Sequence, residues 1–417
     1  MKLIPLSGLS YTERESIAVS TSDLEVLTEL SECENETVRV RVAGNENTSI
    51  EILTKLMKDE SSRVRENVAK HPSTSAKILH ALAKDTAKSV RLTVAKRKKL
   101  TDAIIGKLID DDDSDIVLEI LKTASNISEA NWLKFSKCQH LCVRLEVAES
   151  EKTSIIVLDS LAKDEEWEVR RAVAQNANTT AKILEILAKD EDDDVREAVA
   201  LNTNSTSKIL QCLAKDGRWD VRVAVAKNAN TPVNTLIELA EDCDDDVRVA
   251  VAENVNSTSR ILKDLSNDDN SDVREAVAAN PNATTEILKD LAEDALRDVR
   301  EAVASNVNSV LEILELLSKD GYFVVRQAVV TNPNTTAEIL KALAKDESVD
   351  VRTDLAQNSN ITLEILEILS EDKHWAIRNA VAKHPNASKE TLIKLLVFDK
   401  DEEVRESARI HLKEIMS

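Results

Sequence analysis

Apolar residues in this chain recur at helical spacing in pairs of short segments. In the stretch 272–294, one segment places Val and Ala on a single helix face at 273–277, and a second places Ile and Leu on a face at 287–291. The Asn-Pro-Asn at 280–282 separates the two segments, because Asn tolerates the left-handed conformation of a helix C-cap and proline cannot continue a helix. The pattern predicts two short helices joined by a turn.

The second helix of the pair carries a start signal in several copies. A Ser or Thr followed three residues later by Glu is the pattern of a capping box, as at Thr48 and Glu51, at Ser309 and Glu312, and at Thr335 and Glu338. Isolated helices below about 12 residues are marginal in water. Each pair must therefore pack on its neighbours.

The two-helix pattern recurs about every 26 residues along nearly the whole chain, and an arginine marks each copy. Such a period is typical of a solenoid, in which each repeat contacts only its neighbours. We predict an all-α solenoid of about sixteen two-helix repeats with no sheet. Val117 stands at one of the sixteen positions, and the others are Arg14, Arg39, Arg65, Arg91, Arg144, Arg170, Arg196, Arg222, Arg248, Arg274, Arg300, Arg326, Arg352, Arg378 and Arg405.

The repeat has a specific consensus, Asp-x-x-Val-Arg-x-Ala-Val-Ala-x-Asn-Pro-x-Thr-x-x-Ile-Leu-x-x-Leu-Ala-x-Asp, clearest in residues 165–386. It resembles the leucine-rich repeat variant family, a relative of the HEAT and armadillo helical repeats, over about 390 positions. The resemblance implies a right-handed superhelix of alternating short helices, some of the tighter 3₁₀ type. Some family members carry a cysteine cluster for an iron–sulfur centre ahead of the repeats, and this sequence lacks that cluster.

We predict a single continuous array over residues 1–417. It comprises an N-terminal cap with the first repeat (1–36), regular repeats (37–96), degenerate repeats (97–152), further regular repeats (153–400) and a C-terminal cap (401–417).

Charge narrows the choice of partner. The chain has 76 acidic and 55 basic residues, a formal charge of −21, and the acid is spread along its length. This charge repels polyanions and disfavours nucleic acid as a partner, because nucleic-acid binding rests on Lys and Arg that neutralise phosphates.

Cysteines and apolar runs indicate the compartment. The five cysteines are scattered and do not resemble a disulfide framework. The sequence has no apolar run of about 18 residues, the length that would predict a membrane span. We expect a cytoplasmic protein.

Two polar columns are interpreted as structural. An acid recurs 21 positions after the valine that precedes each arginine, as in Asp294 and Asp320. We predict bidentate Arg–carboxylate pairs that tie neighbouring repeats together. An asparagine column, which includes Asn254 and Asn280, is interpreted as helix caps whose amides bond along the array.

Aromatic residues are 2% of the chain, and four of them share one register, two positions before the anchor Val or Ile, in the predicted loop between units. Other copies have Asp245 or Arg297 at this register, which indicates an exposed position. Exposed Trp is typical of binding hot spots, although each ring could instead cover a groove between repeats. The four candidate partner-binding residues are Trp167, Trp219, Phe323 and Trp375.

The degenerate repeats at 97–152 lack Asn-x-Asn, have Val117 in place of Arg, and contain Trp132 and Phe135, which we add to the candidates. Three interpretations stay open: a separate partner site, a bend in the superhelix, and divergence tolerated by a redundant array.

No catalytic, cofactor-binding or metal site is predicted. Signature motifs for nucleotide binding and hydrolysis are missing, and there are only five glycines. The acidic runs at 110–113, 192–194 and 244–246 lack the alternation and the glycine of a calcium loop. Cys138 and Cys142 have no second pair at zinc-site spacing.

The sequence therefore favours a non-catalytic scaffold or adaptor that binds a protein partner, and the acid favours a partner with a basic face. One alternative is a nucleic-acid-handling protein similar to the helical-repeat DNA glycosylases, which would use Trp132 and the basic run 96–99. Another is a structural or self-assembling element. The oligomeric state is left open.

Overall fold

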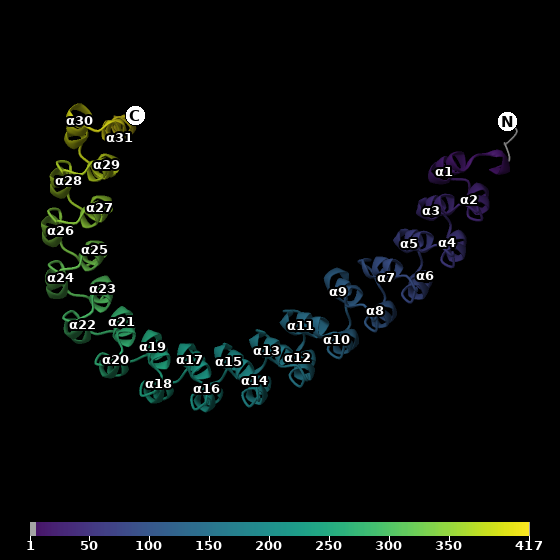
Figure 1. Ribbon diagram of the computed structural model, residues 1–417, viewed down its shortest axis with the longest axis horizontal. Coiled ribbons are helices and arrows are strands. Elements are labelled where there is room, and N and C mark those ends of the chain that lie inside the picture. The colour runs from purple at the N-terminus through teal and green to yellow at the C-terminus, as the bar shows by residue number, and fades with distance from the viewer. Residues whose placement is uncertain (1–5, 417) are drawn as a thin grey trace. The chain divides into compact units, whose positions relative to one another are not determined.

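The computed structural model describes residues 6–416, and all regular secondary structure within them is helical. The chain forms two compact units, Met1–Asn204 and Ser205–Ser417. Each unit alternates longer and shorter helices (Figure 1). The predicted all-α helical-repeat solenoid is confirmed. The right-handed twist and the single continuous array stay predictions.

The first unit begins with a 3₁₀ turn, η1 (Leu6–Gly8). Its helices are α1 (Tyr11–Ser20), α2 (Leu24–Leu30), α3 (Glu36–Gly44), α4 (Ile50–Leu56), α5 (Ser62–Lys70), α6 (Ala76–Leu82), α7 (Lys88–Ala95), α8 (Asp102–Leu108), α9 (Ser114–Thr123), α10 (Glu129–Phe135), α11 (Leu141–Glu149), α12 (Ile155–Leu161), α13 (Trp167–Gln175), α14 (Ala181–Leu187) and α15 (Asp193–Leu201).

The second unit ends with two helices that are longer than the others in it. Its helices are α16 (Ser207–Leu213), α17 (Trp219–Lys227), α18 (Val233–Leu239), α19 (Asp245–Glu253), α20 (Ser259–Leu265), α21 (Ser271–Ala279), α22 (Thr285–Leu291), α23 (Arg297–Ser305), α24 (Leu311–Leu317), α25 (Phe323–Thr331), α26 (Ala337–Leu343), α27 (Val349–Gln357), α28 (Leu363–Leu369), α29 (Trp375–Lys383), α30 (Lys389–Phe398) and α31 (Glu402–Met416).

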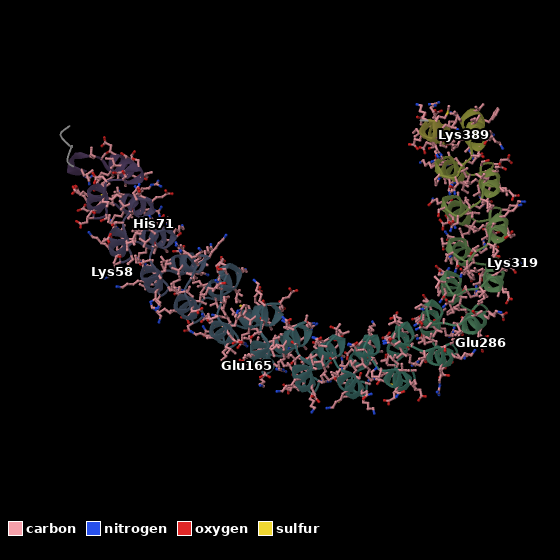
Figure 2. The ribbon with its side chains drawn as sticks, turned by 180° about the vertical axis from the view of Figure 1, so that it is seen from behind. Lys58, His71, Glu165, Glu286, Lys319 and Lys389 are labelled. Carbon is pink, nitrogen blue, oxygen red and sulfur yellow. The ribbon has the colours of Figure 1, made fainter. Side chains whose placement is uncertain are left out.

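Within each unit, the odd-numbered helices stack side by side in one layer and the even-numbered helices form a second layer (Figure 1). Valines such as Val273 and Val277 on α21 and leucines such as Leu288 on α22 are fully buried. Burial of one such side chain contributes about 2 kcal/mol. Charged residues lie outside this core, and Glu286 and Lys319 are exposed on the side of the even-numbered helices of the second unit (Figure 2).

The asparagine column joins consecutive odd-numbered helices. The Asn280 Nδ2 atom donates to the carbonyls of Ala252 and Asn254 at 2.6 and 3.2 Å, and its Oδ1 accepts from the Asn282 amide at 2.8 Å. The same acceptors, 28 and 26 residues earlier, serve Asn176, Asn306 and Asn332. The prediction that these amides bond along the array is confirmed.

The conformation of these caps differs from the prediction. Asn280 has φ −67° and ψ 131°, an extended backbone, and no non-glycine residue in the described part of the chain has a positive φ. The left-handed cap was therefore wrong. The extended backbone leads the chain straight out of the helix, and the buried side chain takes over the hydrogen bonding.

The predicted capping boxes were wrong by one residue. The hydroxyls of Thr48, Ser309 and Thr335 donate to the carbonyls of valines six residues earlier, in the preceding helix. The N-cap residues of α4, α24 and α26 each lie one position later. These hydroxyls close the turn between two helices. A true capping box occurs at Ser10 and Glu13 in α1.

The degenerate repeats keep the contact between consecutive odd-numbered helices with other side chains. Arg97 occupies the asparagine column, and its Nη1 donates to the carbonyls of Ala69 and His71 at 3.0 Å. One repeat later, the Thr123 hydroxyl donates to the Ala95 carbonyl at 2.7 Å. Arg97 is thus engaged with the backbone, which leaves lysines as the exposed cations of the basic run 96–99.

Candidate protein-binding edge

A ladder of buried ion pairs runs along one edge of each unit, where an even-numbered helix leads into the next odd-numbered helix. The Arg300 Nε and Nη2 atoms bind the two carboxylate oxygens of Asp320 at 2.6 and 3.1 Å. The same bidentate pairing, with an aspartate 20 or 21 residues later, is made by Arg39, Arg65, Arg91, Arg144, Arg170, Arg222, Arg248, Arg274, Arg326, Arg352 and Arg378. The predicted pairing is confirmed.

Except at Asp111, where Val117 follows, each ladder aspartate also contacts the following arginine through its backbone. The Arg300 Nη1 atom donates to the carbonyl of Asp294 at 2.7 Å, while the Asp294 carboxylate accepts from Arg274. One aspartate therefore bridges two arginines, which explains how the pairs tie neighbouring repeats together.

The ladder is interrupted at Val117, which is fully buried. Cys138 stands where the carboxylate would be, because its carbonyl accepts from the Arg144 Nη1 atom at 2.8 Å as the carbonyls of the ladder aspartates do, so both members of the pair are replaced. The His140 Nε2 atom lies 3.0 Å from the Asp111 carbonyl, the acceptor that an arginine side chain would otherwise use. A buried carboxylate without its arginine would be costly, which accounts for the joint replacement.

The ladder perturbs the ionisation of its members. Burial opposes ionisation of Asp320, but hydrogen bonds from Arg300 and from the Tyr322 amide outweigh burial and hold the pKa of this carboxyl below its ordinary value. The hydrogen bond that Arg300 donates to Asp320 in turn raises the pKa of Arg300. Both groups are charged at neutral pH, and the ladder acts as a rigid frame.

The candidate aromatic residues begin helices on this edge. Trp167, Trp219, Phe323 and Trp375 are the first residues of α13, α17, α25 and α29. Their predicted place in a loop is corrected to the first helical turn. In the second unit the three rings are 42–44% exposed, and Trp167 in the first unit is half-buried.

The two aromatic candidates of the degenerate segment lie elsewhere. Trp132 is half-buried and lines a hollow of about 420 Å³ with Ser128 and Lys152. Phe135 is 0% exposed and belongs to the core of the first unit. A fully buried ring cannot contact a partner, so Phe135 is corrected from a candidate contact to a core residue. The rings of Trp132 and Phe135 lie 6.1 Å apart.

Sequence reasoning missed two exposed apolar residues on the same edge. Leu296 and Tyr322 are 45% and 50% exposed and are the N-cap residues of α23 and α25. The guanidinium carbons of Arg297 and Arg300 lie 5.6 and 5.8 Å from the centroid of the Tyr322 ring. Such cation–π contacts hold the ring in place. Leu296 and Tyr322 lie one position before the register that the sequence singled out, and together with Phe323 they form an apolar surface.

A hollow of about 650 Å³ is connected to this apolar surface through Arg300, which lines the hollow and lies 5.8 Å from the Tyr322 ring. Five carboxylates but only two cations line it: Glu293, Asp294, Glu312, Glu315, Asp320, Arg300 and Lys319. Three of these carboxylates are paired, Asp294 with Arg274, Glu312 with Lys289 and Asp320 with Arg300. Within residues 6–416, Glu293 and Glu315 form no ion pair. The exposed Leu316 also lines the hollow. We name this hollow, with Leu296, Tyr322 and Phe323, the central edge site.

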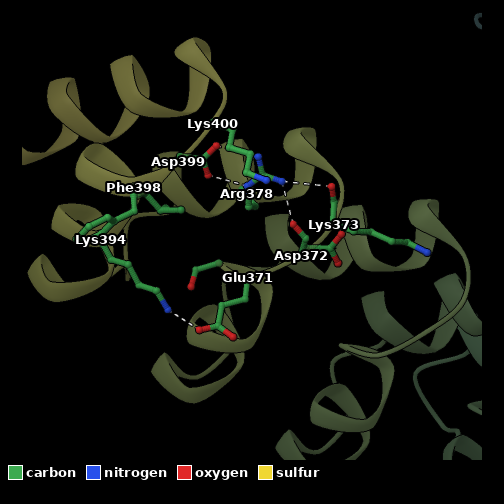
Figure 3. Close-up of a pocket in the computed structure, with 10 residues that line it drawn as sticks. Glu371, Asp372, Lys373, Arg378, Lys394, Phe398, Asp399 and Lys400 are labelled. Atoms are coloured by element: carbon green, nitrogen blue, oxygen red, sulfur yellow. Dashed lines mark hydrogen bonds and ion pairs between the residues drawn. The ribbon is translucent and has the colours of Figure 1, made fainter.

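The same place in the last ladder step has a second hollow, of about 390 Å³ (Figure 3). Here Lys394 pairs with Glu371, and Arg378 pairs with Asp399 (Figure 3). Phe398 also lines the hollow and is 78% exposed.

An acidic cluster lies on the odd-numbered helices α21 and α23 of the second unit. Burial, together with the nearby charges of Asp298, Asp272 and Glu301, raises the pKa of Glu275.

Other candidate chemistry is absent from the described residues. No group of three or more His, Cys, Asp or Glu side chains within 6–416 is arranged to hold a metal ion. Asp192 and Asp244, from two of the acidic runs, cap helices α15 and α19. No described helix combines the length and apolar character needed to cross a membrane.

No protein-family model and no curated protein matches this chain. It is similar to a solved structure described as a leucine-rich repeat variant with a novel repetitive motif, with 26% identity and a TM-score of 0.44, over 54% of this chain and 88% of that one. The resemblance expected from the repeat pattern is confirmed.

The chain is also similar to helical-repeat karyopherins. A structure of Kap95p binding RanGDP matches with 12% identity and a TM-score of 0.33, over 96% of this chain and 69% of that one. Kap121p bound to Ste12p matches with 13% identity and a TM-score of 0.36, over 99% of this chain and 50% of that one.

Proposed function

We propose that this chain is a non-catalytic scaffold or adaptor that binds a protein partner with a basic surface. The observation that carries the proposal is the row of exposed aromatic residues Trp219, Phe323 and Trp375, which share one register on the edge of the second unit. Large exposed rings on a rigid frame supply contact area at low entropic cost, and Trp and Tyr are enriched among binding hot spots.

Electrostatics supports a basic partner. The chain carries a formal charge of −21, and burial together with neighbouring carboxylates on α21 and α23 raises the pKa of Glu275, in the same unit as the exposed aromatic residues. Complementary charge steers association and selects partners. The five cysteines are free thiols, which suits the reducing cytoplasm that the proposal assigns to the protein.

Affinity purification from the native lysate tests the proposal. The wild-type chain is compared with a variant in which Trp167, Trp219, Phe323 and Trp375 are changed to Ser. We expect the wild type to capture a partner that the variant loses, because truncating a hot-spot residue costs roughly 2 kcal/mol or more in binding free energy.

A matched control changes exposed apolar residues away from the edge, Val255, Val307 and Leu363, to Ser; these are 53–62% exposed. Thermal unfolding of all three proteins must be alike. Equal capture of the partner by the aromatic variant and the wild type would contradict the proposal.

A further inference from the structure

The central edge site breaks local rules that neighbouring repeats obey. Asp244, Asn270 and Ser348 cap helices α19, α21 and α27 with their side chains. Leu296 and Tyr322 hold the same position and make no side-chain cap hydrogen bond. Loss of such a cap costs about 1 kcal/mol. Other helices, such as α17 with Arg218 and α29 with His374, also lack a side-chain cap. These two consecutive repeats, however, place an exposed apolar group at the position, which is the pattern expected of a functional site.

Gly321, next to Tyr322, has no structural need to be glycine. A Cβ atom there would meet nothing within 4 Å, and the backbone does not adopt a positive φ. The equivalent position holds glutamate in four other repeats, Glu60, Glu165, Glu191 and Glu347. The missing side chain leaves the surface beside Tyr322 open.

The hollow lacks a cation that other repeats supply. At the equivalent place Glu371 pairs with Lys394, Glu32 pairs with Lys55, and Glu238 pairs with Lys215 at 3.8 Å. Glu293 faces Leu316 at this pair of positions, and Leu316 is 48% exposed. A lysine or arginine from outside could lay its apolar stem over Leu316 and bring its charge to Glu293 and Glu315.

We infer that the central edge site docks an extended segment of a partner protein in which a lysine or arginine lies close to an apolar side chain. The cation enters the acidic hollow, and the apolar side chain covers Leu296, Tyr322 and Phe323. Glu293 and Glu315, the two carboxylates of the hollow that form no ion pair among the described residues, select the basic partner. This inference rests on the proposed function and names where that partner docks.

Selection of random short peptides displayed on phage, with the full chain as bait, tests the inference. Two variants provide counter-selection. Leu316→Lys supplies the missing cation from within the chain, as Lys394 does in the last ladder step. The double variant Leu296→Asn with Tyr322→Asn restores the caps, as Asn270 does. Both changes are expected to preserve or raise the unfolding midpoint, so misfolding does not explain a loss of binding.

We expect wild-type-specific peptides that combine Lys or Arg with an apolar residue and bind each variant at least tenfold more weakly.

Gly321→Glu sharpens the test. An added carboxylate would strengthen a purely electrostatic attraction, but it would obstruct docking beside Tyr322, so we expect the selected peptides to bind this variant more weakly than the wild type. Gly217→Glu, at the same register, should bind as the wild type does. Selected peptides that are acidic, that bind Leu316→Lys undiminished, or that bind Gly321→Glu more tightly would overturn the inference. If the aromatic-dependent partner is still captured in that case, the proposed function stands without it.

Discussion

The hollow of the central edge site and the hollow beside Phe398 share one frame and differ in lining. In the first, Arg300 binds Asp320 and the Asp294 carbonyl. In the second, Arg378 binds Asp399 and the Asp372 carbonyl in the same way (Figure 3). The first has five carboxylates and two cations, and the second three carboxylates and four cations.

The difference shows which positions the fold constrains. The buried Arg–Asp pair recurs because an unpaired buried charge is costly, whereas the residues around it are exposed and free to vary. Recognition can therefore change from one ladder step to the next while the frame stays the same, so the lining is where function is to be sought.

Removing the frame should have the largest effect. Replacing Arg300 or Arg378 by Ala leaves a carboxylate buried and unpaired, and we expect each change to cost about 3 kcal/mol of local stability. Hydrogen exchange of α23 and α25, or of α29 and α31, measures the loss, because a long repeat array does not unfold in a single step. Arg297→Ala, at an exposed arginine, is the control. Similar protection in Arg300→Ala and the control would refute the structural role of the ladder.

Acid should weaken both frames, by less than removal of the arginine. The folded-state pKa values of Asp320 and Asp399 lie below the ordinary 3.8. For Asp320, hydrogen bonds from Arg300 and the Tyr322 amide outweigh burial, and for Asp399 the hydrogen bond from Arg378 is the main cause. Their stabilisation is thus complete above the unfolded pKa and is lost as pH falls through the folded pKa. Hydrogen exchange below pH 3.8 should show weaker protection at both steps, whereas unchanged protection would contradict the assignment.

Changing the lining of the last ladder step should leave the fold intact. Lys394→Leu gives the last step the pairing of the first, with Glu371 facing a leucine as Glu293 does. Because the Lys394–Glu371 pair is exposed, we expect a shift in the unfolding midpoint too small to resolve. Binding of a basic peptide at the central edge site should be unaffected. A large stability loss would show that the lining belongs to the frame.

Phe398→Lys should have the smallest effect on stability. The residue before the ladder aspartate is polar in the other steps, for example Lys319 and Lys345, and Phe398 is 78% exposed. We expect a change within about 0.5 kcal/mol in chemical denaturation. A loss well above 1 kcal/mol would mean that Phe398 packs as a core residue.

The sequence predicted the frame because its residues repeat. Two apolar helical faces, the Arg–Asp pairing and the inter-repeat amide bonds all follow from columns that recur every 26 residues. The failures were local. The capping hydroxyls were assigned one residue too early, since Thr48 and its equivalents bond backward to the preceding helix. The asparagine caps have an extended backbone because the buried side-chain amide, and not a left-handed turn, supplies the hydrogen bonds at the end of the helix.

The candidate site was less accessible to sequence reasoning. Exposed rings at Trp219, Phe323 and Trp375 could be inferred from the mixed composition of their column. The burial of Phe135 could not, because the degenerate repeats hide the register. Leu296 and Tyr322 could have been found by asking which N-cap positions lack a capping side chain, and the hollow only by pairing Glu293 with Leu316 in space.

The most direct measurement is an NMR titration of the isotope-labelled chain with a selected basic peptide, following backbone amide shifts. The account predicts saturable shifts that cluster at residues 293–298 and 312–323, with the amides of Leu296, Tyr322 and Phe323 among the largest. Shifts confined to 371–400, or spread evenly along the acidic chain, would contradict it.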